Sequence, residues 1–159
     1  MKGNKKVIAK LNELLRDELT AINQYMVHSE MCANWGYTRL HNEIERRAIT
    51  EMKHAEKHIA RIIFLEGIPE VSRLNDMKIG ANVEQQFKND LKDEIGAVTS
   101  YNDGVKIAAD AGDNATRDML ESILADEEDH VDWLEAQLDQ ITQMGIQNYL
   151  AQQVKEPSA

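Results

Sequence analysis

The chain has 159 residues and a formal net charge of −10, from 18 Lys and Arg against 28 Asp and Glu. This acidic balance argues against a generic nucleic-acid-binding protein and favours the attraction of cations. With 8 Gly, 2 Pro and no apolar run near the ~20 residues that span a bilayer, collagen-like, low-complexity and transmembrane classes are excluded, and the length suits one domain over residues 1–159.

Long stretches without Gly or Pro predict helices over most of the chain. We expect four long helices and a short fifth one, at about 5–34, 38–66, 83–111, 114–144 and 146–154. The segment 67–82 is long enough to cross a bundle from end to end, whereas the other connections are short and favour antiparallel hairpins. The sequence therefore predicts an all-α four-helix bundle with a long crossover between the second and third helices and a short C-terminal helix.

The apolar stripes of the four long helices contain acidic residues. Each helix carries apolar side chains at heptad-like spacing, and each stripe holds one glutamate: Glu18, Glu51, Glu94 and Glu127. An ionised carboxylate that is buried without a partner is strongly destabilising, and four of them at one level would also repel one another. The pattern therefore indicates that a positive charge is bound among them.

Two pairs of segments repeat at the same distance along the chain. Residues 17–25 (DELTAINQY) resemble residues 93–101 (DEIGAVTSY), and residues 51–56 (EMKHAE) resemble residues 127–132 (EEDHVD), both at an offset of 76. Each half of the chain thus supplies one helix with a single Glu and a second helix with Glu-x-x-His. Folded together, the halves predict a pseudo-twofold cluster of four Glu and two His.

This cluster suits a pair of metal ions. The two side chains of a Glu-x-x-His sequence lie on one helix face and can reach the same ion, and the glutamates of the first or third helix can bridge the two ions. Oxygen and imidazole ligands without a thiolate suit iron or manganese, with zinc as a competitor. A lone Glu-x-x-His is usually a solvated pair, but two copies in register favour a metal site. The candidate ligands are Glu18, Glu51, His54, Glu94, Glu127 and His130.

Other polar residues of the stripes are predicted to have structural roles. His58 lies one turn beyond the first Glu-x-x-His and is interpreted as a packed or supporting residue, not as a ligand. His28 is expected in the core and His41 at the surface. Tyr25 and Tyr101 lie two turns from their glutamates and are predicted to pack with a hydrogen-bonded hydroxyl, with a redox role as the less favoured alternative.

Several motifs resemble those of the bacterioferritin family, over nearly the whole chain: MKG at 1–3, AINQY at 21–25, NWG at 34–36, EMKHA at 51–55, FLEGIP at 64–69, DEEDH at 126–130 and GIQNYL at 145–150. The resemblance implies a ferritin-like bundle, and a homo-oligomer in which dimers assemble into a hollow 24-mer. It implies a ferroxidase that oxidises Fe(II) with dioxygen or peroxide, and ferric mineral stored in the cavity. The family's ligands for two Fe ions per subunit fall, by position, on the six residues selected above.

Met52 has two interpretations. It lies about 100° around its helix from Glu51, next to a second apolar face made by Leu19, Ile22, Met26 and Ile49. From these residues alone, Met52 is a packing residue at a subunit interface. The resemblance implies instead that Met52 from each of two subunits is an axial ligand of a b-type haem, one haem per subunit pair.

The sequence departs from the family at three positions. Glu45, Arg46 and Thr50 stand where many members have an aromatic residue, a His and an acidic residue. In some members the last two form an additional iron site on the inner surface, which Arg46 and Thr50 cannot form. We therefore do not transfer that site, and Glu45 and Met26 change the expected haem surroundings.

The leading functional interpretation is iron storage with ferroxidase activity. One alternative is a di-iron or di-manganese oxidase or peroxidase that stores nothing, and another is a silent metal-stabilised bundle that carries haem or binds a partner. The C-terminal stretch 145–154 favours a shell. The resemblance also implies a small ferredoxin-type electron donor for iron release. No nucleic-acid or membrane partner is expected, and the single cysteine, Cys32, fits a reducing cytoplasm.

Overall fold

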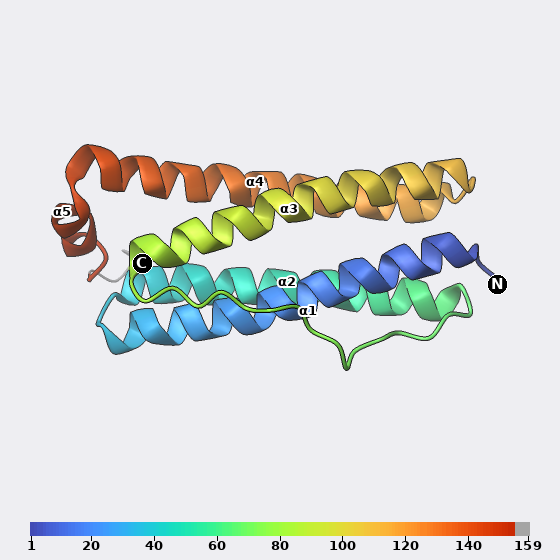
Figure 1. Cartoon of the computed structure of the whole chain (residues 1–159), viewed down its shortest axis with the longest axis horizontal. Helices are drawn as coiled ribbons and strands as arrows, with labels where there is room; N and C mark the ends of the chain where they lie inside the picture. Colours follow the sequence, from blue (N-terminus) through green and yellow to red (C-terminus); the bar gives the residue numbers. More distant parts are fainter. Residues whose placement is uncertain (155–159) are drawn as a thin grey trace.

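The computed structural model describes residues 1–154, and these residues are helical apart from the turns, the terminal residues and one long connection (Figure 1). Its helices are α1 Lys5–Asn34, α2 Thr38–Phe64, α3 Val83–Asp110, α4 Asn114–Met144 and α5 Ile146–Ala151. The predicted four-helix bundle with a short fifth helix is confirmed. The last part of the predicted single domain, residues 155–159, lies outside the described residues. None of the described helices is both long and apolar enough to span a bilayer.

Local signals set where the helices begin and end. The side chains of Asn4, Asn82 and Asp113 accept hydrogen bonds from backbone N–H groups in the first turns of α1, α3 and α4. Gly36 and Gly112, in the turns of the two hairpins, have φ of 81° and 70°, a conformation that favours glycine. These glycines are themselves one 76-residue offset apart, so the internal repeat includes the hairpin turns.

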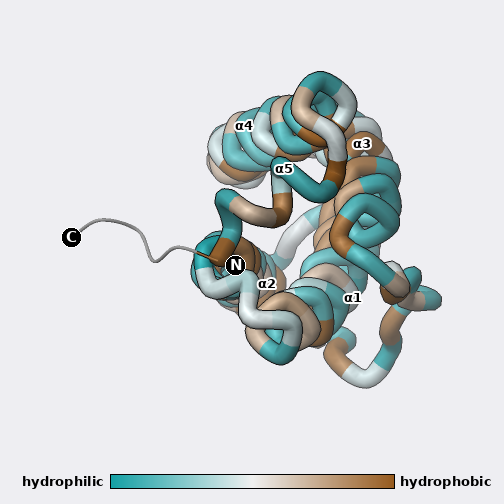
Figure 2. Tube along the Cα trace, turned by 90° about the vertical axis from the view of Figure 1, so that its left-hand side faces the viewer, coloured by the Kyte–Doolittle hydropathy of each residue, from teal (hydrophilic) through white to brown (hydrophobic). Residues whose placement is uncertain are grey.

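Three helix ends differ from the prediction, and one of them, the end of α3 at Asp110, differs by a single residue. α2 ends at Phe64, two residues before the predicted end, because the chain turns at Glu66, whose φ is 61°. α5 ends at Ala151, three residues before the predicted end, and residues 152–154 form turns. The buried ring of Tyr149 packs α5 against α3, 6.3 Å from the ring of Phe87, so the short helix covers one end of the bundle (Figure 2).

The crossover between α2 and α3 runs along α1 (Figure 1). Three of its backbone N–H groups donate to side chains one turn apart on α1: Asn75 to Thr20 Oγ1 (2.9 Å), Lys78 to Gln24 Oε1 (2.9 Å) and Gly80 to His28 Nε2 (3.0 Å). His28 is fully buried, as predicted, and its Nδ1 lies 3.0 Å from Asp90 of α3. This ladder holds the crossover and α3 against α1.

The apolar core has two parts. One part lies around Leu11, Leu14 and Ile62, and the other around Ile44, Phe87 and Leu134. Five apolar residues at heptad-like spacing along the long helices are only half-buried: Ala21, Leu91, Val98, Val105 and Leu138. Along the stripes the glutamates fall between the two parts, so a polar layer divides the core near the middle of the bundle.

Candidate metal centre

The six predicted ligands meet in this polar layer. Glu18 comes from α1 and Glu94 from α3, and the two Glu-x-x-His pairs come from α2 and α4. All six are buried, with exposed fractions from 1% for Glu51 to 7% for His130. The fold therefore assembles the predicted cluster of four Glu and two His from residues far apart in the sequence.

Their ligand atoms form two overlapping groups, in each of which the atoms lie within 4.8 Å of one another. The members of the first group are Glu18, Glu51, His54 and Glu127, and those of the second are Glu51, Glu94 and His130. His54 Nδ1 lies 3.0 Å from oxygens of both Glu51 and Glu127. His130 Nδ1 lies 2.8 Å from Glu94 Oε1. Each group has the composition and spacing to hold one ion.

The grouping differs from the expectation in two respects. Glu127 groups with His54 across the bundle, not with His130 on its own helix. The carboxylate common to both groups is Glu51 of α2, not a glutamate of the first or third helix. The reason is that the His54 ring points across to α4, where its Nε2 lies 3.1 Å from Asp126 Oδ2. Helical spacing specifies a shared face but not the partner across the bundle.

Arg47 is a member of the site that the sequence analysis missed. Its side chain is only 14% exposed, and its Nη2 lies 3.0 Å from Glu127 Oε2. Arg47 Nε lies 2.6 Å from Glu51 Oε1. The available signal was the spacing of Arg47 and Glu51, which are four residues apart and so adjacent on one helix face. That spacing usually marks a solvated surface pair, so it did not indicate a buried cation.

Burial and hydrogen bonds together set the pKa values of the first group. Burial raises the pKa of Glu18 and of Glu127, and it raises the pKa of Glu51 to about 7. Burial by itself would favour a neutral His54, but hydrogen bonds to Glu127, Glu18 and Glu51 outweigh it and raise the pKa of His54 to about 12. Without metal, the cluster therefore retains protons at neutral pH.

In the second group, neighbouring positive charges outweigh the effect of burial on the pKa of Glu94. Burial by itself would raise the pKa of Glu94, but the adjacent His130 and the Arg47 guanidinium outweigh it and hold that pKa well below its ordinary value. Three buried carboxylate oxygens still lack a hydrogen-bond partner among the described residues: Glu51 Oε1, Glu94 Oε2 and Glu127 Oε1. Buried acceptors without donors are costly. Their arrangement fits cations that would use these oxygens as ligands.

Two tyrosines surround the cluster and, like the ligands, are 76 residues apart. Tyr25 donates to Glu94 Oε1, and Tyr101 donates to Glu18 Oε1, each from the opposite hairpin. The predicted hydrogen-bonded packing role is confirmed for both. His58 Nε2 lies 2.7 Å from the Tyr101 hydroxyl, outside both ligand groups, and burial lowers the pKa of His58 to about 3. His58 is thus a neutral, packed histidine.

The expected exposure of His41 is wrong. His41 is half-buried, because its Nδ1 lies 2.9 Å from the buried Ser29 hydroxyl on α1. This contact joins α1 to α2 near their hairpin turn and is remote from the ligand groups.

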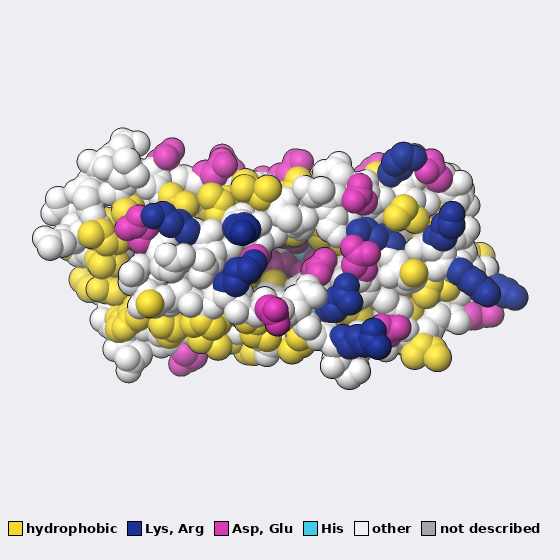
Figure 3. Space-filling view, viewed as in Figure 1, with side chains coloured by type: hydrophobic (Ala, Val, Ile, Leu, Met, Phe, Trp, Pro, Cys, Tyr) yellow, Lys and Arg dark blue, Asp and Glu magenta, His cyan; other side chains and the backbone are white. Residues whose placement is uncertain are grey.

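Two hollows reach the cluster from different sides of the bundle. One, of about 460 Å³, lies beside α1, α3 and the crossover and is lined by Glu18, Glu51, Glu94 and Glu127. Asp17, Asp76 and Asp93 also line it, and Figure 3 shows the hollow near the middle of that face, with acidic side chains around it.

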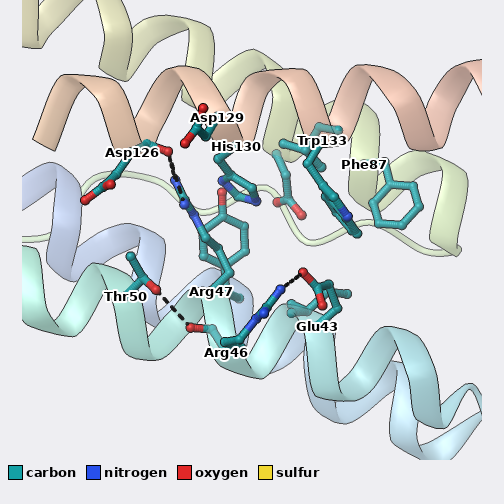
Figure 4. Close-up of a pocket in the computed structure, with 13 residues that line it drawn as sticks. Glu43, Arg46, Arg47, Thr50, Phe87, Asp126, Asp129, His130 and Trp133 are labelled. Atoms are coloured by element: carbon teal, nitrogen blue, oxygen red, sulfur yellow. Dashed lines mark hydrogen bonds and ion pairs between the residues drawn. The ribbon is translucent and has the colours of Figure 1, made fainter. Parts of the chain in front are cut away.

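The other hollow, of about 410 Å³, lies between α2 and α4 (Figure 4). Arg47, Asp126, Asp129 and His130 are on its wall. Arg46 and Thr50 line it too. The Arg46 guanidinium pairs with Glu43, and the Thr50 hydroxyl donates to the Arg46 carbonyl oxygen.

Met52 lies outside the cluster. Its side chain is 44% exposed, and the nearby Ile49 and Met26 are 45% and 48% exposed. Leu19 and Ile22 of the same predicted face are half-buried. The second apolar face of the helical hairpin is therefore present at the surface.

The chain is similar in sequence to a known protein family over most of its length. A family model described as a ferritin-like domain matches residues 8–144. The bacterioferritin of Brucella melitensis is 43% identical over 149 residues, which cover 94% of this chain and 92% of the relative. The bacterioferritin of Mycobacterium bovis is 40% identical over 157 residues, or 99% of both chains. That of Rhodobacter capsulatus is 40% identical over 149 residues, covering 94% of this chain and 92% of the relative.

Proposed function

The chain belongs to the bacterioferritin family of ferritin-like proteins, and we propose from this and from its carboxylate–histidine cluster that it stores iron and oxidises Fe(II) to Fe(III). The observation that carries the proposal is the pair of overlapping ligand groups, buried and joined through Glu51. Oxygen-rich groups with one imidazole each and no thiolate are suited to iron.

Each ligand has a proposed role. Glu18 and His54 bind one Fe(II), Glu94 and His130 bind the other, and Glu51 bridges them with Glu127 beside it. Four carboxylates balance the four charges of two Fe(II) ions. Because His54 and Glu51 carry protons at neutral pH in the metal-free protein, iron binding displaces protons from the site.

The oxidation requires an external electron acceptor. Each Fe(II) loses one electron, and the acceptor is dioxygen, which takes two electrons and two protons to become hydrogen peroxide, or peroxide, which is reduced to water. The acidic hollow beside α1 and α3 is a suitable entry for Fe(II), since its wall carries Asp17, Asp76 and Asp93.

We place haem at Met52. The chain fits this group in that the thioether is exposed on an apolar surface and is not buried in the core. When bound, haem would supply a one-electron redox centre between two subunits. Met52 of each subunit would hold the iron, and Ile49 and Met26 would contact the macrocycle.

Assembly completes the proposal. Dimers form over the apolar surface around Met52 and build a 24-mer, whose cavity holds the ferric mineral. A small ferredoxin-type protein supplies electrons for iron release, and the protein works in the cytoplasm.

The test combines particle mass with iron uptake. Light scattering on the purified protein should give the mass of 24 chains, and Fe(II) added in air should be oxidised and retained in the particle. A small oligomer that oxidises Fe(II) without retaining it would favour the non-storing oxidase. A particle that does not accelerate oxidation would favour the silent bundle.

A further inference from the structure

Arg47 places a guanidinium inside the glutamate cluster. Its Nε lies 2.6 Å from Glu51 Oε1, and its Nη2 lies 3.0 Å from Glu127 Oε2 and 3.8 Å from Glu94 Oε2. It thus touches three of the four glutamates, on three different helices. Each of these glutamates is also a proposed iron ligand, so the guanidinium and iron use the same three carboxylates.

The guanidinium forms a hydrogen bond with only one of these three carboxylates, from Nη2 to Glu127 Oε2. Arg47 Nε and Glu51 Oε1 are close but not aligned as a hydrogen bond, and neither has another hydrogen-bond partner among the described residues. Glu94 Oε2 lacks one as well. A structural Arg–carboxylate pair frequently forms two parallel hydrogen bonds. With Glu51 and Glu94, Arg47 is therefore in close contact without an aligned hydrogen bond.

Arg47 and two metal ions exclude each other from this position. The ligand atoms of Glu51, Glu94 and His130 lie within 4.8 Å of one another, so an ion among them would lie next to the guanidinium. Like charges at such a distance repel strongly in a buried site. One guanidinium also supplies a single positive charge where two Fe(II) ions supply four. Iron binding therefore requires the guanidinium to move.

The hollow between α2 and α4 offers it a place (Figure 4). Arg47 lines this hollow together with Asp126, Asp129 and the Arg46–Glu43 ion pair. Both Nη atoms already lie 3.3 Å from the Asp126 carbonyl oxygen, at the boundary between the hollow and the cluster. Rotation of the long side chain can move the charge from buried glutamates to these more exposed acidic groups.

We propose that Arg47 is an internal counter-ion, which occupies the carboxylate cluster in the metal-free protein and withdraws into the α2–α4 hollow when two metal ions bind. Arg47 is thereby a positioning residue that lowers the affinity of the centre for iron and ties release of iron to return of the guanidinium. The inference rests on the proposed function of the cluster as an iron site.

The test compares Arg47→Gln with Arg46→Gln in the assembled protein. Arg46 is a matched control, because it is the adjacent residue, carries the same charge and is 72% exposed, paired only with Glu43 among the ion pairs of residues 1–154. Anaerobic calorimetric titration with Fe(II) measures affinity and stoichiometry without oxidation. Arg47→Gln should bind Fe(II) at least about tenfold more tightly, within the range of coupling between competing ligands. Arg46→Gln should match the wild type.

The direction in which Fe(II) affinity changes distinguishes a counter-ion from a residue that only holds the glutamates in position. If Arg47 merely held the glutamates in position for iron, its removal would weaken binding, so equal or weaker binding in Arg47→Gln would overturn the inference. Failure of the wild type to bind two Fe(II) would overturn the proposed function, and this inference with it. A crystal structure of the wild type with Zn(II) keeps the test independent of the variant's folding. It should show two ions with the guanidinium withdrawn, and a guanidinium still paired with Glu51 and Glu127 beside two ions would refute the inference.

Discussion

Replacement of Glu51 by Gln should weaken metal binding at both positions of the centre. Glu51 belongs to both ligand groups, in which all ligand atoms lie within 4.8 Å of one another. An ion held among these atoms lies closer than that to each of them, so one carboxylate charge is worth at least about 3–4 kcal/mol per unit of metal charge at an effective dielectric constant near 20. Loss of the charge should therefore weaken each site by at least about a hundredfold. Glutamine keeps the size of the side chain and a carbonyl oxygen, so the loss of metal affinity reports mainly the loss of the negative charge.

The metal-free protein should tolerate the same change. The pKa of Glu51 is raised by burial to about 7, so its carboxyl group is largely protonated just below neutral pH, and the neutral amide resembles that form. The free energy of unfolding without metal should change by about 1 kcal/mol or less. Anaerobic Fe(II) titration and thermal unfolding measure the two effects, with the exposed Glu56→Gln on the same helix as control. Two ions bound by Glu51→Gln with the affinity of the wild type would refute the bridging role.

Three further predictions concern the ligands, the haem and pH. Glu18→Ala and Glu94→Ala each remove a member of one group, so each should reduce the stoichiometry from two ions towards one and slow the rapid phase of Fe(II) oxidation in stopped-flow traces by a similar factor. Met52→Leu should cost less than ~1.5 kcal/mol in packing and abolish the haem absorption bands, while particle mass and iron oxidation persist; unchanged bands would identify another ligand. Because the pKa values of Glu51 and His54 are raised, the metal-free site holds protons that Fe(II) binding must release. Fe(II) affinity should therefore fall as pH is lowered from 8 to 5, and proton release during the titration should be measurable. Affinity independent of pH would contradict this.

The raised pKa of Glu51 also makes the free energy of unfolding of the metal-free protein depend on pH. The folded-state pKa of Glu51, about 7, is above its ordinary value of 4.5. Between these values the folded chain keeps a proton that the unfolded chain has lost, so this group makes the folded state less stable as pH rises through that range. Bound metal takes the place of the proton and should remove this dependence.

The repeat explains why so much of the site could be predicted from the sequence. Glu18 and Glu94, like Gly36 and Gly112, are 76 residues apart, and the repeat predicts one glutamate on each long helix from the sequence alone. A glutamate inside an apolar stripe is a strong signal because its burial requires a compensating charge.

The partners across the bundle could not be predicted in the same way. Glu127 pairs with His54 and not with His130. This pairing depends on how the side chains of two residues more than 70 positions apart in the sequence point toward each other. The sequence analysis assigned no role to Arg47, because only the packing of α4 against α2 brings Glu127 to its guanidinium. His41 is half-buried for a similar reason, since Ser29 on the neighbouring helix faces it.

Anomalous X-ray diffraction at the iron edge, on crystals soaked anaerobically with Fe(II), tests the central claim most directly. We expect two peaks per chain about 3.5–4 Å apart, as in other two-metal sites, with Glu51 between them. One should lie beside Glu18 and His54, and the other beside Glu94 and His130. Peaks confined to the surface, or a single peak outside these ligands, would contradict the assignment of the cluster as a di-iron ferroxidase centre.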